Sequence, residues 1–140
     1  MVLVIDSNVL FTYFWESSVF REFCSHGLIM LSPEFALEEI NKYKEEIMKK
    51  ASISESQFNS YRQELVERVD FIALEDYEEE LAQLTKQIVD EELLEDIDLL
   101  ALAKKLDCPL WSNDVRLQDQ SIVITLTTKN IIEVLDFKPI

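Results

Sequence analysis

Four carboxylates stand at positions where solubility alone would not place an acid: Asp6, Glu39, Asp96 and Asp114. Ligands that are all oxygen suit hard cations, so this set predicts Mg²⁺ or Mn²⁺ rather than Zn²⁺. Several carboxylates around such an ion suit metal-assisted hydrolysis of a phosphodiester. Without a cation, their mutual repulsion would raise the carboxyl pKa values and destabilise the fold.

The ends of two expected strands place Asp6 and Asp114. Asp6 follows the fully apolar run from Met1 to Ile5, and Asp114 follows an expected strand at 109–112. Ligands of parallel α/β sheets bind beyond the carboxyl ends of the strands, where the strand order reverses. These two strands are the usual neighbours at that point, so both acids should face one crevice. A helix N-cap is an alternative account of Asp114.

Glu39 belongs to a helix expected from Pro33 to about Lys50. Its apolar residues form one stripe: Ala36, Ile40, Tyr43, Ile47 and Ala51. Glu39 projects roughly 80° from the centre of this stripe, whereas Glu38 projects roughly opposite it. Glu39 can therefore lean over the edge of the sheet, and Glu38 is an ordinary surface acid. A plain position on the rim explains the spacing of Glu39 equally well.

Asp96 is separated from Asp98 by the same projection. The buried side of a helix expected over residues 96–106 is made by Leu99, Leu102, Ala103 and Leu106. Asp96 projects into this arc and Asp98 lies well off it. A buried acid is costly unless it is paired or bound to a cation. A cap that answers the helix dipole is the alternative for Asp96.

The rest of the chain alternates strands and helices. Strands are expected at 1–5, 28–31, 69–74, 109–112 and 122–126. Helices are expected from Asp6–Asn8 onward, then at 18–25, 33–50, 54–68, 76–92, 96–106 and 130–135. This alternation predicts a single α/β domain over residues 1–140, with a mostly parallel sheet between helices.

Capping residues set several of these boundaries. Ser32 is the expected N-cap ahead of Pro33, while Ser54 and Asp76 are expected to begin capping boxes. Asp107 should end a helix in a left-handed turn.

The chain is strongly acidic, with 13 basic and 28 acidic residues and a formal net charge of −15. Phosphate contacts normally use clustered Lys and Arg, so this is the wrong sign for a nucleic-acid binder. Solubilising charge and charge networks are two ordinary explanations, and acids gathered around cations are a third.

The N-terminus has no basic flank, and no apolar run reaches the length of a membrane span, so we expect a cytoplasmic protein.

The sequence gives little support for catalysis by cysteine or histidine. Cys24 and Cys108 are far apart and form no C-x-x-C pair, so buried thiols are favoured, with a disulfide left open. His26, the single histidine, precedes Gly27 at an expected helix end, where a cation suits the last carbonyls.

These residues resemble the PIN-domain family, the PilT N-terminus-like nucleases that include the VapC-type toxins. The matching segments are Val4-Ile5-Asp6-Ser7-Asn8, Glu39-Ile40, Asp96 with Ala101-Leu102-Ala103, and Trp111-Ser112-Asn113-Asp114. They occur in the family's order and spacing over nearly the whole chain.

The resemblance implies a three-layer α/β/α sandwich with strand order 3-2-1-4-5. It also implies Mg²⁺- or Mn²⁺-dependent endoribonuclease activity on single-stranded RNA, with the four acids as metal ligands and catalytic residues. Asn8 would orient Asp6 or the scissile phosphate. Ser112 would act similarly, keeping the hydroxyl of the commoner threonine. Many relatives are dimeric toxins restrained by an antitoxin, so a homodimer and an antitoxin partner are implied; others act in RNA processing.

Other functions fit the sequence less well. A haloacid-dehalogenase-type phosphatase needs a second Asp where Asn8 stands, and a receiver domain needs an Asp ending the third strand, where Leu74-Glu75-Asp76 fits poorly. The non-enzymatic alternative is a PIN-like interaction or RNA-processing scaffold that leaves the acids unused.

Overall fold

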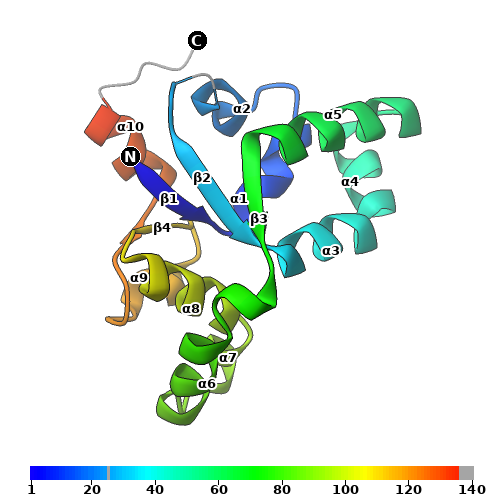
Figure 1. The fold of residues 1–140 in the computed structure, drawn as a ribbon. Coiled ribbons are helices and arrows are strands. Elements are labelled where there is room, and N and C mark those ends of the chain that lie inside the picture. Colours follow the sequence, from blue (N-terminus) through cyan, green and yellow to red (C-terminus); the bar gives the residue numbers. More distant parts are fainter. Residues whose placement is uncertain (25, 136–140) are drawn as a thin grey trace.

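A five-stranded parallel sheet of order β3-β2-β1-β4-β5 lies at the centre of the computed structural model, which describes residues 1–24 and 26–135 (Figure 1). Its strands are β1 (Val2–Ile5), β2 (Ile29–Pro33), β3 (Val69–Ile72), β4 (Leu110–Trp111) and β5 (Thr125–Leu126). All four strand pairings are parallel, and the predicted order is confirmed.

Helices cover both faces of the sheet. Because successive strand residues point to opposite faces, alternate residues of β1 are buried on opposite sides. Leu3 and Ile5 join one core cluster, and Val4 joins the other. The first cluster takes buried residues from α1 (Ser7–Phe11), α2 (Val19–Phe23), α3 (Glu34–Lys42), α4 (Lys44–Ala51), α5 (Glu55–Arg68) and α10 (Thr128–Leu135). The second takes them from α6 (Glu78–Gln87), α8 (Ile97–Leu106) and α9 (Val115–Asp119). The result is the expected three-layer sandwich.

Aromatic packing holds the first layer against the sheet. Phe14, in the short 3₁₀ helix η1 (Thr12–Phe14), stacks on Phe58 with ring centroids 4.9 Å apart. Phe20 of α2 lies 5.3 Å from the fully buried Trp111 of β4. Each such side chain stabilises the fold by roughly 1.5–3 kcal/mol through burial alone. These contacts fix the segments that flank Asp6 and Ser112.

The expected helix from Pro33 to Lys50 is wrong in two respects. The helix is broken at Tyr43 into α3 and α4, and Pro33 rather than Ser32 is the N-cap. Ser32 is fully buried in β2, and its hydroxyl donates to the Ile5 carbonyl oxygen at 2.9 Å. That hydroxyl is therefore committed to the neighbouring strand and is not available to cap the following helix.

The expected long helix over residues 76–92 is also wrong. In its place the chain forms a 3₁₀ turn η2 (Leu74–Asp76), α6, and a short α7 (Glu91–Leu94) capped by Asp90. Tyr77, not Asp76, is the N-cap of α6, because its ring is buried in the second cluster. Ile88 then adopts an extended conformation that ends the helix.

Two local expectations are confirmed: Ser54 and Gln57 form the capping box of α5, and Asp107 is left-handed at φ 50°. Both cysteines are free, as favoured, but only partly buried. The short helix α9 follows Asp114, where the sequence offered a helix N-cap only as an alternative. Within the described residues, no helix is long and apolar enough to cross a membrane.

Candidate functional site

Asp6 lies at the carboxyl end of β1, where it is the N-cap of α1 and only 4% exposed. Its Oδ2 accepts a hydrogen bond of 2.6 Å from the Ser112 hydroxyl, and its Oδ1 accepts one of 3.5 Å from the backbone N–H of Asn8. The register that sets Ile5 opposite Trp111 brings Asp6 beside Ser112. Burial raises the pKa of Asp6, partly offset by the Ser112 hydrogen bond.

Glu39 reaches the same edge of the sheet from α3. Its Oε1 accepts a hydrogen bond of 2.9 Å from the hydroxyl of Ser7, the first residue of α1. Burial raises the pKa of Glu39, and the nearby charge of Asp6 raises it further. Glu38 is exposed and Glu39 is partly buried. The helical projection therefore distinguished the surface glutamate from the one at the sheet edge correctly.

Asp96 sits at the N-cap position of α8, one residue outside the helix expected for it, and its side chain makes no capping hydrogen bond. Its Oδ2 is buried without a hydrogen-bond partner, and Nη2 of Arg116 lies 3.8 Å away, beyond hydrogen-bond distance. Burial, followed by the charge of Asp6, raises the pKa of Asp96 to about 6. The helix-cap alternative therefore does not explain this side chain.

Asp114 caps the helix α9, in agreement with the N-cap alternative for this residue. Its Oδ1 accepts the backbone N–H of Arg116 at 2.9 Å, and its own N–H donates to the Ser112 hydroxyl at 3.0 Å. The Arg116 guanidinium also donates two hydrogen bonds to the carboxylate: Nε lies 3.3 Å from Oδ1, and Nη2 lies 2.9 Å from Oδ2. These hydrogen bonds hold the pKa of Asp114 below its usual value.

Arg116 is the residue that the sequence reasoning missed. Besides Asp114, it lies within 4.0 Å of Glu92, 3.9 Å of Glu95 and 3.8 Å of Asp96. The available signal was its isolation, because no other Lys or Arg occurs between Lys105 and Lys129. In the folded chain Arg116 lies among four acids, and three of them, Glu92, Glu95 and Asp96, are distant from it in the sequence. Its positive charge offsets part of their mutual repulsion.

A cavity of about 210 Å³ joins three of the four expected acids: Asp6, Glu39 and Asp96. Asn8 also lines it, whereas Asp114 does not. Asp98 lines the cavity as well, against the expectation that it would lie apart, and it accepts a 2.7 Å hydrogen bond from the Tyr77 hydroxyl.

In the part of the chain that the structure describes, no three acidic, histidine or cysteine side chains are close enough together to hold a metal ion. Hydrogen bonds explain the separation, because Glu39 is tied to Ser7 and Asp114 to Arg116. The donor set nevertheless fits a hard cation, since it offers only oxygen ligands and the buried Asp96 Oδ2 has no hydrogen-bond partner. For Asp114 to act as a ligand, its carboxylate must turn from Arg116 toward the other acids or share its oxygens with the guanidinium.

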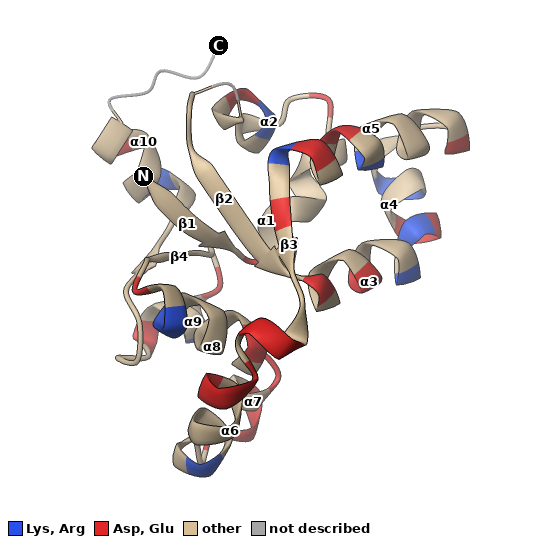
Figure 2. Ribbon diagram, in the orientation of Figure 1, with Lys and Arg blue, Asp and Glu red and all other residues tan. Residues whose placement is uncertain are grey.

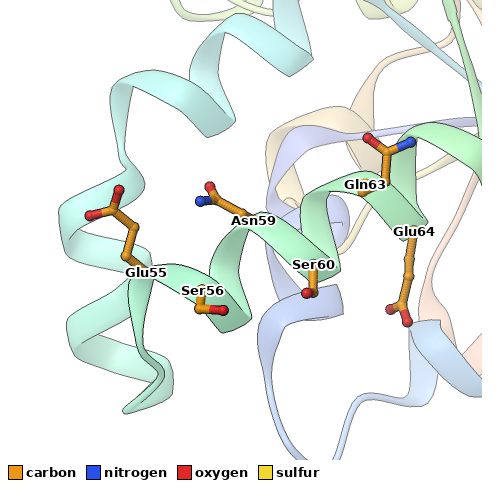
Figure 3. Close-up of a pocket in the computed structure, with 6 residues that line it drawn as sticks. All are labelled: Glu55, Ser56, Asn59, Ser60, Gln63 and Glu64. Atoms are coloured by element: carbon orange, nitrogen blue, oxygen red, sulfur yellow. The ribbon is translucent and has the colours of Figure 1, made fainter.

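A larger hollow lies elsewhere and is not the site. It has a volume of about 790 Å³ and is lined only by residues of α5, as Figure 3 shows: Glu55, Ser56, Asn59, Ser60, Gln63 and Glu64. A hollow along one helix has no second element to converge functional groups on a ligand.

Comparison with known proteins agrees with this geometry. The sequence model of the PIN domain matches residues 4–135. A chain in the crystal structure of VapBC2 from Rickettsia felis, bound to a DNA fragment from their promoter, superposes with a TM-score of 0.60 and 15% identity, covering 91% of this chain and 98% of that one. Likeness at that identity concerns the fold alone. None of the curated proteins compared with this chain matches it. Since the family match spans nearly the whole sequence, the chain belongs to the PIN-domain family, whose members are in general metal-dependent nucleases.

Proposed function

We propose that this protein is a Mg²⁺- or Mn²⁺-dependent endoribonuclease that hydrolyses phosphodiester bonds in single-stranded RNA, with residues 1–140 acting as a single domain. The observation that carries the proposal is the buried Oδ2 of Asp96, which has no hydrogen-bond partner in a cavity shared with Asp6 and Glu39. Buried oxygens of this kind are costly, and a bound cation would remove the cost.

Asp6, Glu39, Asp96 and Asp114 are the residues that would hold the ion. A divalent cation there supplies Lewis-acid chemistry, activating water and neutralising charge that develops on the phosphate. Ser112 holds Asp6 in place through its hydroxyl, and Ser7 does the same for Glu39. Asn8 is exposed at the rim of the cavity, where its side-chain amide can orient a scissile phosphate.

We further propose that the protein is a homodimeric toxin of the cytoplasm, restrained by an antitoxin protein. Support comes from the family and from the fold it shares with a chain of the VapBC2 structure, which is itself a complex bound to promoter DNA. The apolar side chains left exposed on this chain, Phe35 at 50% among them, are compatible with a protein partner.

A non-catalytic scaffold is the second candidate, and one contact favours it. The pairing of Arg116 with Asp114 satisfies one of the four acids within the chain itself. In that case Asp114 would stay paired with Arg116, the site would bind no catalytic ion, and RNA would remain intact.

The deciding experiment is a cleavage assay. Single-stranded RNA of mixed sequence is incubated with the protein in Mn²⁺, in Mg²⁺ and in chelator, beside duplex RNA and single-stranded DNA. We expect metal-dependent internal cuts in single-stranded RNA, abolished by Asp6→Asn and retained by Glu38→Gln, an exposed acid on the same helix as Glu39. Intact single-stranded RNA in every metal would refute the catalytic proposal and leave the scaffold.

A further inference from the structure

A second cavity, of about 310 Å³, adjoins the acidic one. Its walls carry the aromatic side chains of Phe11, Trp15 and Tyr43. Asn8 and Glu39 line both cavities, so the aromatic groove continues directly from the site of the proposed chemistry. A polymer whose backbone crosses the acids therefore has this groove as an exit path.

The aromatic walls are held in place by contacts within the chain. Trp15 ends η1, and its carbonyl oxygen accepts a hydrogen bond of 2.7 Å from Arg21 Nη2. Phe11 of α1 meets Tyr43 edge to face, with centroids 6.2 Å apart and planes at 72°. Tyr43 lies at the break between α3 and α4, so it is not part of one continuous apolar stripe along a single helix. The three rings are each only partly buried, so part of each remains open to a ligand.

The charge near the groove differs from that of the chain as a whole. Lys50 lines the groove together with Glu46, and the ammonium of Lys42 lies 5.3 Å from the centre of the Tyr43 ring. Figure 2 shows blue basic segments along α4 and at the end of α3, interspersed with red acidic ones. A phosphate chain that leaves the acid cavity thus meets Lys50 beside Glu46, with Lys42 close by, rather than negative charge alone.

We infer that the groove is a base-stacking subsite for the stretch of single-stranded RNA next to the cut; this inference rests on the proposed function. With a net charge of −15, the chain cannot draw much RNA affinity from phosphate contacts. Stacking on aromatic rings contributes about 1–3 kcal/mol per base, tolerates any sequence and depends little on the charge of the protein. Bases in a duplex are already stacked on each other, so the groove selects single strands.

Trp15 supplies a direct readout. The chain has two tryptophans, and the other, Trp111, is fully buried, so quenching of the accessible fluorescence reports on Trp15, and its loss in the Tyr43→Leu variant described below assigns it to the groove. An Asp6→Asn background keeps RNA intact during titration. We expect quenching by a short single-stranded RNA, persistence of that quenching at high salt, and little effect from an abasic oligonucleotide of equal length or from duplex RNA.

Tyr43 supplies the matched pair of variants. Tyr43→Leu should weaken RNA binding about five- to a hundredfold, the range that one lost stacking contact implies. Tyr43→Phe keeps the ring and should bind as the parent does, and Mn²⁺-induced thermal stabilisation, measured in each Tyr43 variant with Asp6 intact, should be unchanged in both. Circular dichroism confirms that each variant is folded.

The two proposals fail separately. If wild-type protein cuts RNA but the abasic oligonucleotide binds as tightly as the RNA, the stacking subsite is refuted and the nuclease stands. If RNA stacks in the groove but is never cut, the nuclease fails and the subsite stands. Quenching of Trp15 by an amphipathic peptide but not by RNA would also overturn the inference, and would assign the groove to a protein partner.

Discussion

The hydroxyl of Ser112 lies 2.6 Å from Oδ2 of Asp6, joining residues 106 positions apart in the chain. The same hydroxyl accepts the N–H of Asp114 at 3.0 Å, so one buried oxygen links the carboxyl ends of β1 and β4. This contact explains how a fully buried serine contributes to a site that it does not line.

Ser112→Ala should therefore weaken cation binding and lower stability together. It leaves a buried carboxylate oxygen without its donor, at a cost of about 1–3 kcal/mol in the free energy of unfolding. Loss of the group that orients a ligand typically reduces metal affinity about 10- to 100-fold. Ser112→Thr, which keeps the hydroxyl, is the control. Denaturant unfolding and Mn²⁺ calorimetry measure both effects, and an alanine variant with wild-type cation affinity would show that Ser112 is merely structural.

Asp96→Asn should have opposite effects on the metal-free and metal-loaded protein. Near neutral pH the buried Asp96 carboxylate opposes folding, so the neutral amide should stabilise the metal-free protein by roughly 1–2 kcal/mol. The stabilisation by Mn²⁺ should be largely lost, because a ligand oxygen has been replaced. Thermal melts with and without Mn²⁺ test this, with Glu38→Gln as the unaffected variant. A destabilised metal-free Asp96→Asn protein would contradict the account.

The stability of the metal-free protein should fall as pH rises from about 4 to about 6. Folding raises the pKa of Asp96 from 3.8 to about 6, so the folded state binds the proton more tightly than the unfolded state within this window. The benefit of protonation is full below the unfolded value and is lost as pH passes the folded value, a change on the order of 3 kcal/mol. Burial acts on Asp6 and Glu39 in the same direction. Saturating Mn²⁺ requires ionised ligands and should flatten or reverse the slope in denaturant unfolding curves.

Much of this site could be predicted from the sequence, because strand ends and helix periodicity are local signals. The run before Asp6 and the segment before Asp114 defined two adjacent strand ends, and the helix stripe separated Glu39 from Glu38. Several other side-chain contacts around the site were not predictable. Ser32 binds a strand carbonyl instead of capping a helix, and Tyr77 bonds to Asp98 across 21 residues. Such partners are chosen by tertiary packing, which no local pattern records.

Arg116 should compete with the cation for Asp114. Arg116 is exposed and Asp114 partly buried, and their hydrogen bonds favour the charged forms of both partners. Removing the guanidinium by Arg116→Gln should free Asp114 and raise Mn²⁺ affinity several-fold. Arg116→Lys, which keeps the charge but loses the two-pronged geometry, should fall between the glutamine variant and wild type. Weaker Mn²⁺ binding in Arg116→Gln would mean that the arginine supports the site instead of competing for it.

Divalent-cation binding by the buried acids is the central claim, since catalysis and the competition with Arg116 both depend on it. Its most direct measurement is calorimetric titration of the metal-free protein with Mn²⁺, in wild type, Asp6→Asn and Glu38→Gln. The account predicts saturable binding by wild type and Glu38→Gln, and at least about tenfold weaker binding by Asp6→Asn. Equal affinity in all three proteins, or no binding in wild type, would contradict it.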